Sequence, residues 1–99
     1  MTKFLEEFSF PYQSLRSGQE RFIQEVNNCL TNKNRILVCA PTGIGKTICA
    51  LAPAIKTAKE KNLTIICLTS RQTQANQYIK TIKDISNKSK YPVNYLAFI

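Results

Sequence analysis

The strongest constraint in this sequence is an apolar run that leads into a glycine-containing loop and then into a helical pattern. Residues 36–40 read Ile-Leu-Val-Cys-Ala, and residues 40–47 read APTGIGKT. A continuous apolar run of this length is expected of a strand buried on both faces. A helix is predicted from about residue 46 to residue 61, and Pro53 is expected to kink or interrupt it. The loop is therefore predicted to join the carboxyl end of a strand to the amino end of a helix.

The loop fits the phosphate-loop (Walker A) pattern, with alanine in place of the first glycine. Two glycines let the backbone N–H groups turn toward phosphate oxygens, the lysine reaches the β- and γ-phosphates, and the threonine hydroxyl ligates magnesium. A chance Gly-Lys-Thr turn is the alternative, and the flanking strand and helix argue against it. We therefore predict binding of ATP with Mg²⁺. The predicted cofactor-binding residues are Ala40, Pro41, Thr42, Gly43, Ile44, Gly45, Lys46 and Thr47, of which Lys46 and Thr47 are also assigned catalytic roles and Thr47 the Mg²⁺ contact.

Helical and strand-like segments alternate on both sides of the loop. Apolar residues recur at helical spacing from residue 19 to residue 30 and from about residue 74 to residue 85. Apolar runs at residues 63–68 and 93–99 predict two more strands, whereas the first 17 residues read as irregular. This order predicts an α/β fold with a parallel sheet flanked by helices. Because 99 residues are few for such a domain, we expect it to be partial.

Composition leaves the partner open. The net charge is +8, from 14 Lys and Arg against 6 Asp and Glu, which suits either a nucleic-acid partner or a lysine-rich surface. The four cysteines match no CxxC metal pattern, and buried thiols in an intracellular, reducing setting are expected. No secretory signal or membrane-length apolar segment is found, so no membrane partner is expected.

Residues 10–19, FPYQSLRSGQ, followed by a helix and APTGIGKT, resemble the opening of XPD-type (DinG/XPD-like) superfamily 2 DNA helicases. The resemblance implies an amino-terminal fragment of a RecA-like ATP-binding domain over residues 1–99. Its parts would be a Q-motif lead-in at residues 1–18, Walker A at residues 40–47 and a motif Ia-like segment at residues 69–71. It also implies that the Gln19 amide reads the edge of adenine, with Tyr12 and Arg16 as weaker candidates near the base or ribose. The alternative is a glutamine that only caps a helix or faces water.

The same resemblance assigns Ser70 and Arg71 to the backbone of single-stranded DNA, through a hydroxyl and a guanidinium suited to phosphate contact. Gln72 stands where the family often has threonine. An ordinary polar loop is the alternative for this segment.

Parts needed for ATP hydrolysis are not found in the sequence. None of the six acidic residues ends an apolar strand, and the chain has no histidine, so no Walker B or DEAH-like box is identified. An iron–sulfur cluster is possible in the full-length protein, but the four cysteines do not occupy its ligand positions. We expect the ATP-binding portion of a helicase that couples ATP hydrolysis to translocation on single-stranded DNA, inactive as this chain alone, and cytoplasmic or, in a eukaryote, nuclear. The alternatives are a stand-alone, non-catalytic nucleotide- or nucleic-acid-binding module and a small kinase, which would have no reason to carry FPYQSLRSGQ.

Overall fold

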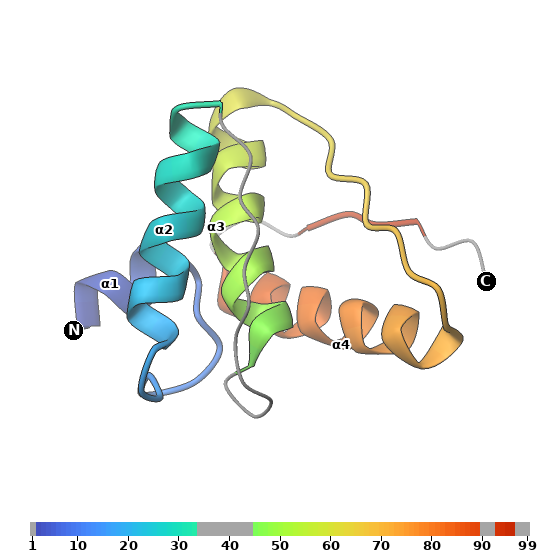
Figure 1. The fold of residues 1–99 in the computed structure, drawn as a ribbon, viewed down its shortest axis with the longest axis horizontal. Coiled ribbons are helices and arrows are strands. Elements are labelled where there is room, and N and C mark those ends of the chain that lie inside the picture. The colour runs from blue at the N-terminus through green and yellow to red at the C-terminus, as the bar shows by residue number, and fades with distance from the viewer. Residues whose placement is uncertain (1, 34–44, 90–92, 97–99) are drawn as a thin grey trace.

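The computed structural model describes residues 2–33, 45–89 and 93–96. These residues form four helices: α1 (Thr2–Glu7), α2 (Gln19–Thr31), α3 (Lys46–Lys61) and α4 (Gln72–Lys88). Helices α2 and α3 lie side by side and run in the same direction, and α4 crosses near the lower end of α3 (Figure 1). Within these ranges no helix is long and apolar enough to cross a lipid bilayer.

The core lies where the helices meet. Ile23 of α2, Cys49 of α3 and Ile85 of α4 have no exposed surface. Because each comes from a different helix, burial of their side chains holds the three helices together. The buried apolar cluster consists of Phe8, Phe10, Ile23, Ile48, Cys49, Leu51, Ala52, Ile55 and Ile85.

The three predicted helices are confirmed. Helix α2 begins at the expected residue, α3 has the predicted bounds, and α4 is longer than predicted at both ends. Helix α3 continues through Pro53, whose ring is buried, so no break occurs there. It ends at Asn62, which has a left-handed conformation, and the Leu63 N–H donates to the Ala58 carbonyl at 2.8 Å. This is the hydrogen bond of a Schellman-type helix end, in which asparagine tolerates a positive φ.

Helix α1 was not predicted, since the first 17 residues read as irregular. It lies before Pro11, so the proline does not interfere with it. The chain after α1 folds back, with the Phe10 N–H donating to the Leu5 carbonyl at 2.9 Å. Lys56 of α3 lies 5.7 Å from the centre of the Phe8 ring and 3.7 Å from the Glu7 carboxylate. These contacts attach the amino-terminal turn to α3.

The predicted parallel sheet is wrong for the described residues, which contain helices and no strands. Residues 63–69 run without a paired neighbour, and every one of them is exposed. Residues 93–96 are also unpaired, while residues 36–40 and 97–99 lie outside the described part of the chain. A strand requires a neighbour that accepts and donates its backbone hydrogen bonds. The apolar pattern measures hydrophobicity and does not report whether that neighbour is there.

Candidate nucleotide-binding site

The described part of the phosphate-loop motif is its last three residues, Gly45, Lys46 and Thr47. Gly45 has φ of +75° and ψ of 54°, a left-handed conformation that glycine adopts without steric cost. Helix α3 starts at the next residue, so Lys46 and Thr47 occupy its first turn. The Lys46 side chain is exposed and Thr47 is half-buried. The roles predicted for residues 40–44 fall outside the described residues.

The start of α3 has the properties of an anion-binding helix end. The first N–H groups of a helix have no acceptor within it, and the helix dipole places partial positive charge there. No acidic residue lies in the first turn of α3. The exposed ammonium of Lys46 adds a full positive charge. An incoming phosphate would therefore meet backbone donors and a lysine at one place.

Gln19 is brought directly against this helix start. A β-carbon placed on Gly45 would lie 2.9 Å from the Gln19 amide nitrogen, Nε2, and 3.2 Å from Cγ2 of Ile48. A side chain at position 45 would therefore require Gln19 or Ile48 to move, and the φ of +75° would be strained for any residue other than glycine. Gln19 and Gly45, far apart in the sequence, thus lie close together in the structure.

The Gln19 side chain is hydrogen-bonded to the turn that precedes α2. Its Oε1 accepts a hydrogen bond from the Arg16 backbone N–H at 2.8 Å, and the Gln19 N–H donates to the Arg16 carbonyl at 3.1 Å. The residue is 3% exposed. Gly18, just before α2, has φ of +86°, and a β-carbon added there would have no other atom within 4 Å, so its backbone angle rather than crowding favours glycine. The alternative of a water-facing glutamine at position 19 is therefore wrong.

Among the described residues near the start of α3, Thr47 is the candidate ligand for a metal ion. Within the described ranges no group of three or more His, Cys, Asp or Glu residues could hold one. Mg²⁺ bound with a nucleotide takes most of its oxygens from phosphates and water, so one threonine hydroxyl is compatible with it.

Cys49 lies in α3 one turn after Gly45. Its N–H donates to the Gly45 carbonyl at 3.2 Å, and burial raises the pKa of the Cys49 thiol to about 11. This thiol is neutral at physiological pH and serves packing.

The predicted DNA-contact residues lie elsewhere. Ser70 and Arg71 are exposed and directly precede α4. The start of α4 is apart from the start of α3 (Figure 1). Oε1 of Gln74, in the first turn of α4, accepts from the Ser70 N–H at 3.3 Å and from its hydroxyl at 3.4 Å. The structure therefore unites Gln19 with Gly45 and keeps Ser70 and Arg71 separate.

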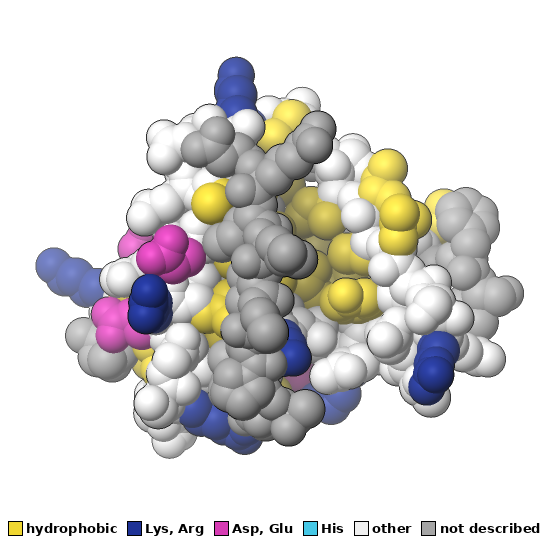
Figure 2. Space-filling view, in the orientation of Figure 1, with side chains coloured by type: hydrophobic (Ala, Val, Ile, Leu, Met, Phe, Trp, Pro, Cys, Tyr) yellow, Lys and Arg dark blue, Asp and Glu magenta, His cyan; other side chains and the backbone are white. Residues whose placement is uncertain are grey.

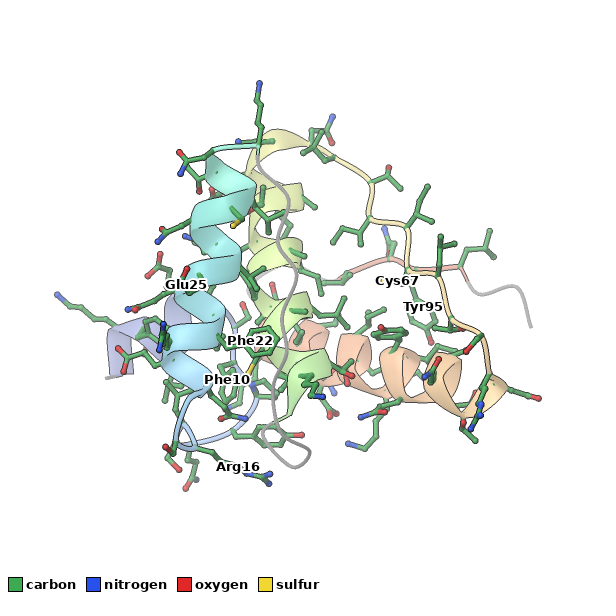
Figure 3. The ribbon with its side chains drawn as sticks, in the orientation of Figure 1. Phe10, Arg16, Phe22, Glu25, Cys67 and Tyr95 are labelled. Carbon is green, nitrogen blue, oxygen red and sulfur yellow. The ribbon has the colours of Figure 1, made fainter. Side chains whose placement is uncertain are left out.

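Two features of the site escaped prediction from sequence. The Arg16 residue contributes its backbone N–H to Gln19, whereas its side chain points away from the helices (Figure 3). Ile48 bounds the other side of Gly45. A backbone donor leaves no mark on residue type, so Arg16 could not have been assigned this role from its side chain. Ile48 could have been found, because it follows the loop within the first turn of α3.

Comparison with known proteins identifies the family of this chain. The chain belongs to the DEAD/DEAH box helicase family, whose pattern it matches over residues 16–97. It is 35% identical over 78 residues to a protein of Methanocaldococcus jannaschii named "Probable ATP-dependent helicase", covering 79% of this chain and 11% of that protein. It is 37% identical over 83 residues to the Bacillus subtilis protein named "3'-5' exonuclease DinG", covering 84% of this chain and 9% of that one. The chain thus spans about a tenth of the length of these relatives, and no solved structure matches it.

The match begins at Arg16 and so includes the Arg16–Gln19 pair, the end of the phosphate loop and the start of α4. The resemblance to superfamily 2 helicases drawn from FPYQSLRSGQ and APTGIGKT is confirmed at the level of this family.

Proposed function

We propose that this chain is the ATP-binding portion of an XPD-type DNA helicase that, as a full-length protein, couples ATP hydrolysis to movement along single-stranded DNA. One observation carries the proposal: the Gln19 amide lies against Gly45 at the start of α3. This contact joins the two motifs on which the family resemblance was based. The contact supports the proposal because Gly45 is the last glycine of the predicted phosphate-binding loop.

In this proposal the chain's own residues bind and orient the nucleotide. The backbone N–H groups at the start of α3 and the Lys46 ammonium hold the β- and γ-phosphates. The Thr47 hydroxyl contacts Mg²⁺, which supplies charge neutralisation when bound. Gln19 provides the amide for adenine. The contacts predicted for residues 40–44 lie outside the described residues.

Chemistry beyond binding requires groups that the described residues do not assemble. Hydrolysis needs a carboxylate for Mg²⁺ and a group that orients the attacking water. The first turn of α3 contains no acidic residue. The two acidic residues of the neighbouring helix α2, Glu20 and Glu25, are both exposed. We therefore expect this chain to bind ATP and not to turn it over.

Contact with DNA is assigned to the turn before α4. Ser70 and Arg71 are exposed there, and Gln74 holds the Ser70 backbone and hydroxyl. An exposed guanidinium next to a fixed hydroxyl suits a phosphate of the DNA backbone. This part of the proposal requires that a bound single strand covers the start of α4, which amide hydrogen exchange at residues 69–72 reports.

The nucleotide site is tested by titrating the chain with Mg·ATP in a calorimeter. Replacing Lys46 by alanine removes a charge-assisted contact to phosphate and should weaken binding by roughly ten- to a hundredfold. Lys61→Ala is the matched control, because Lys61 is an exposed lysine at the opposite end of the same helix. It should bind as the wild type does. Equal affinities for the wild type and Lys46→Ala would reject the site.

A further inference from the structure

We propose that residues 63–69 form an interface with a second copy of this chain, in which the same segment of the two copies pairs as antiparallel strands about a two-fold axis. The proposal goes beyond the proposed function and does not depend on nucleotide binding. It rests on the unpaired backbone of this segment, on the exposed apolar side chains around it and on its lack of charge.

The backbone of this segment has no strand beside it. The Leu63 N–H donates to the Ala58 carbonyl at the end of α3. Among the residues that the structure describes, no backbone group of residues 64–69 is hydrogen-bonded to another backbone group. An extended segment with a row of unpaired N–H and C=O groups is a template for pairing with another chain. A second copy would supply the neighbour that the apolar pattern of residues 63–68 requires and that the described part of one chain lacks.

Residues 63–69 and 93–96 carry most of the exposed apolar side chains of the described chain. Of the seven large apolar side chains exposed there, six lie on these two segments: Leu63, Ile65, Ile66, Leu68, Tyr95 and Leu96. Together with α3 and α4 the segments line a groove of about 800 Å³ (Figure 2), to which neither Gly45 nor Lys46 contributes. Each large side chain contributes roughly 100 Å². The six therefore reach the upper limit for the apolar patch of a monomer and approach the ~800 Å² per partner of a stable dimer.

The lack of charge in this segment favours a second copy as the partner. Residues 63–69 read LTIICLT, without a charged residue or a proline, and these are the residues that usually keep an exposed edge from pairing. In an antiparallel pair centred on Ile66, the seven uncharged residues of each copy lie opposite one another, so no like charges meet within the paired stretch. A two-fold axis closes this pair, and association stops at the dimer.

Analytical ultracentrifugation of the chain over a range of concentrations measures the dimer. We expect a dissociation constant of roughly 10 to 100 μM, because the patch is small for a stable interface. Both copies carry a net charge of +8, so added salt should screen their repulsion and tighten the dimer. Amide hydrogen exchange at residues 64–68 should slow as the concentration rises. In dilute solution the chain is a monomer, and residues 63–69 stay exposed.

Residue 66 lies opposite its own copy in this arrangement, which allows a charge-swap test. Ile66→Lys and Ile66→Glu each place like charges directly opposite one another and should weaken the dimer at least about tenfold. An equimolar mixture places a lysine opposite a glutamate and should restore association to within about threefold of the wild type. Ile66 is 80% exposed, so both variants should stay folded, as circular dichroism checks. Gln24→Lys and Gln24→Glu change the same charges at an exposed position of α2 and should dimerise as the wild type does.

A wild-type chain that stays monomeric up to about 1 mM would overturn the proposal. A dimer that neither Ile66 variant weakens would lie on another surface, and assembly beyond the dimer would exclude a closed two-fold pair. If the mixture of the two variants fails to restore association, residue 66 does not face its copy and the antiparallel pairing is wrong. The nucleotide site is tested separately by Lys46→Ala, so failure of the dimer leaves the proposed function intact.

Discussion

Apolar side chains are buried where the helices meet and exposed in the two extended segments, residues 63–69 and 93–96. Where the helices meet, Ile23 and Ile85 are fully buried. In the extended segments, Ile66 is 80%, Leu68 is 87% and Leu96 is 80% exposed. Apolar side chains gather visibly beside these segments, where α3, α4 and both segments line a groove of about 800 Å³ (Figure 2). A hydrophobic residue is buried only when another element packs on it, and α2 and α3 provide this for each other.

The largest expected difference between the two regions is in thiol reactivity. Cys49 has no exposed surface, and burial raises its pKa to about 11, so about one thiol in a thousand is ionised at pH 8. Cys67 is exposed and faces the groove near Tyr95 (Figure 3), where partial desolvation also raises its pKa. Iodoacetamide should label Cys67 roughly a hundredfold faster than Cys49, as followed by mass spectrometry of peptides.

Both labelling rates should rise with pH, since the thiolate is the reactive form and both pKa values are raised. Labelling in denaturant supplies the control, because the two cysteines should then react at similar rates. Equal labelling rates for Cys49 and Cys67 in the folded protein would mean that solvent reaches Cys49 in the first turn of α3.

A smaller contrast is expected in stability. Ile23 is fully buried between helices, so Ile23→Ala should lower the free energy of unfolding by about 3 kcal/mol. The matched change Leu68→Ala removes a side chain that is 87% exposed and should stay within about 0.5 kcal/mol of the wild type. Urea unfolding followed by circular dichroism measures both. A cost for Leu68→Ala as large as that for Ile23→Ala would show that residues 63–69 are packed in solution.

The same contrast explains what could be predicted from the sequence. Helices α2 and α3 were predictable because their apolar spacing and their starts after Gly18 and Gly45 are local properties. Helix α1 was missed, since so short a helix shows too little periodicity. The strand at residues 63–68 was predicted wrongly, because a strand depends on a neighbour that local sequence does not report.

For the candidate site, the sequence names residues and does not give their contacts. Lys46 and Thr47 were predicted from the phosphate-loop pattern and Gln19 from the resemblance to a family, and their roles stay predictions. That the Gln19 amide touches Gly45 follows from the packing of α2 beside α3, which no motif encodes. The bond from the Arg16 N–H to Gln19 depends on the turn before α2. Both contacts are tertiary or backbone features.

Amide hydrogen exchange with and without Mg·ATP compares ligand binding at the start of α3 with the rest of the chain in one experiment. We expect slower exchange at residues 45–48 and 16–19 on addition of Mg·ATP, with exchange at residues 63–69 and 93–96 unchanged. A parallel sample with an oligothymidylate should instead slow exchange at residues 69–72. Unchanged exchange at residues 45–48 with saturating Mg·ATP, or equal slowing at residues 63–69 and 93–96, would show that the nucleotide does not bind at the start of α3.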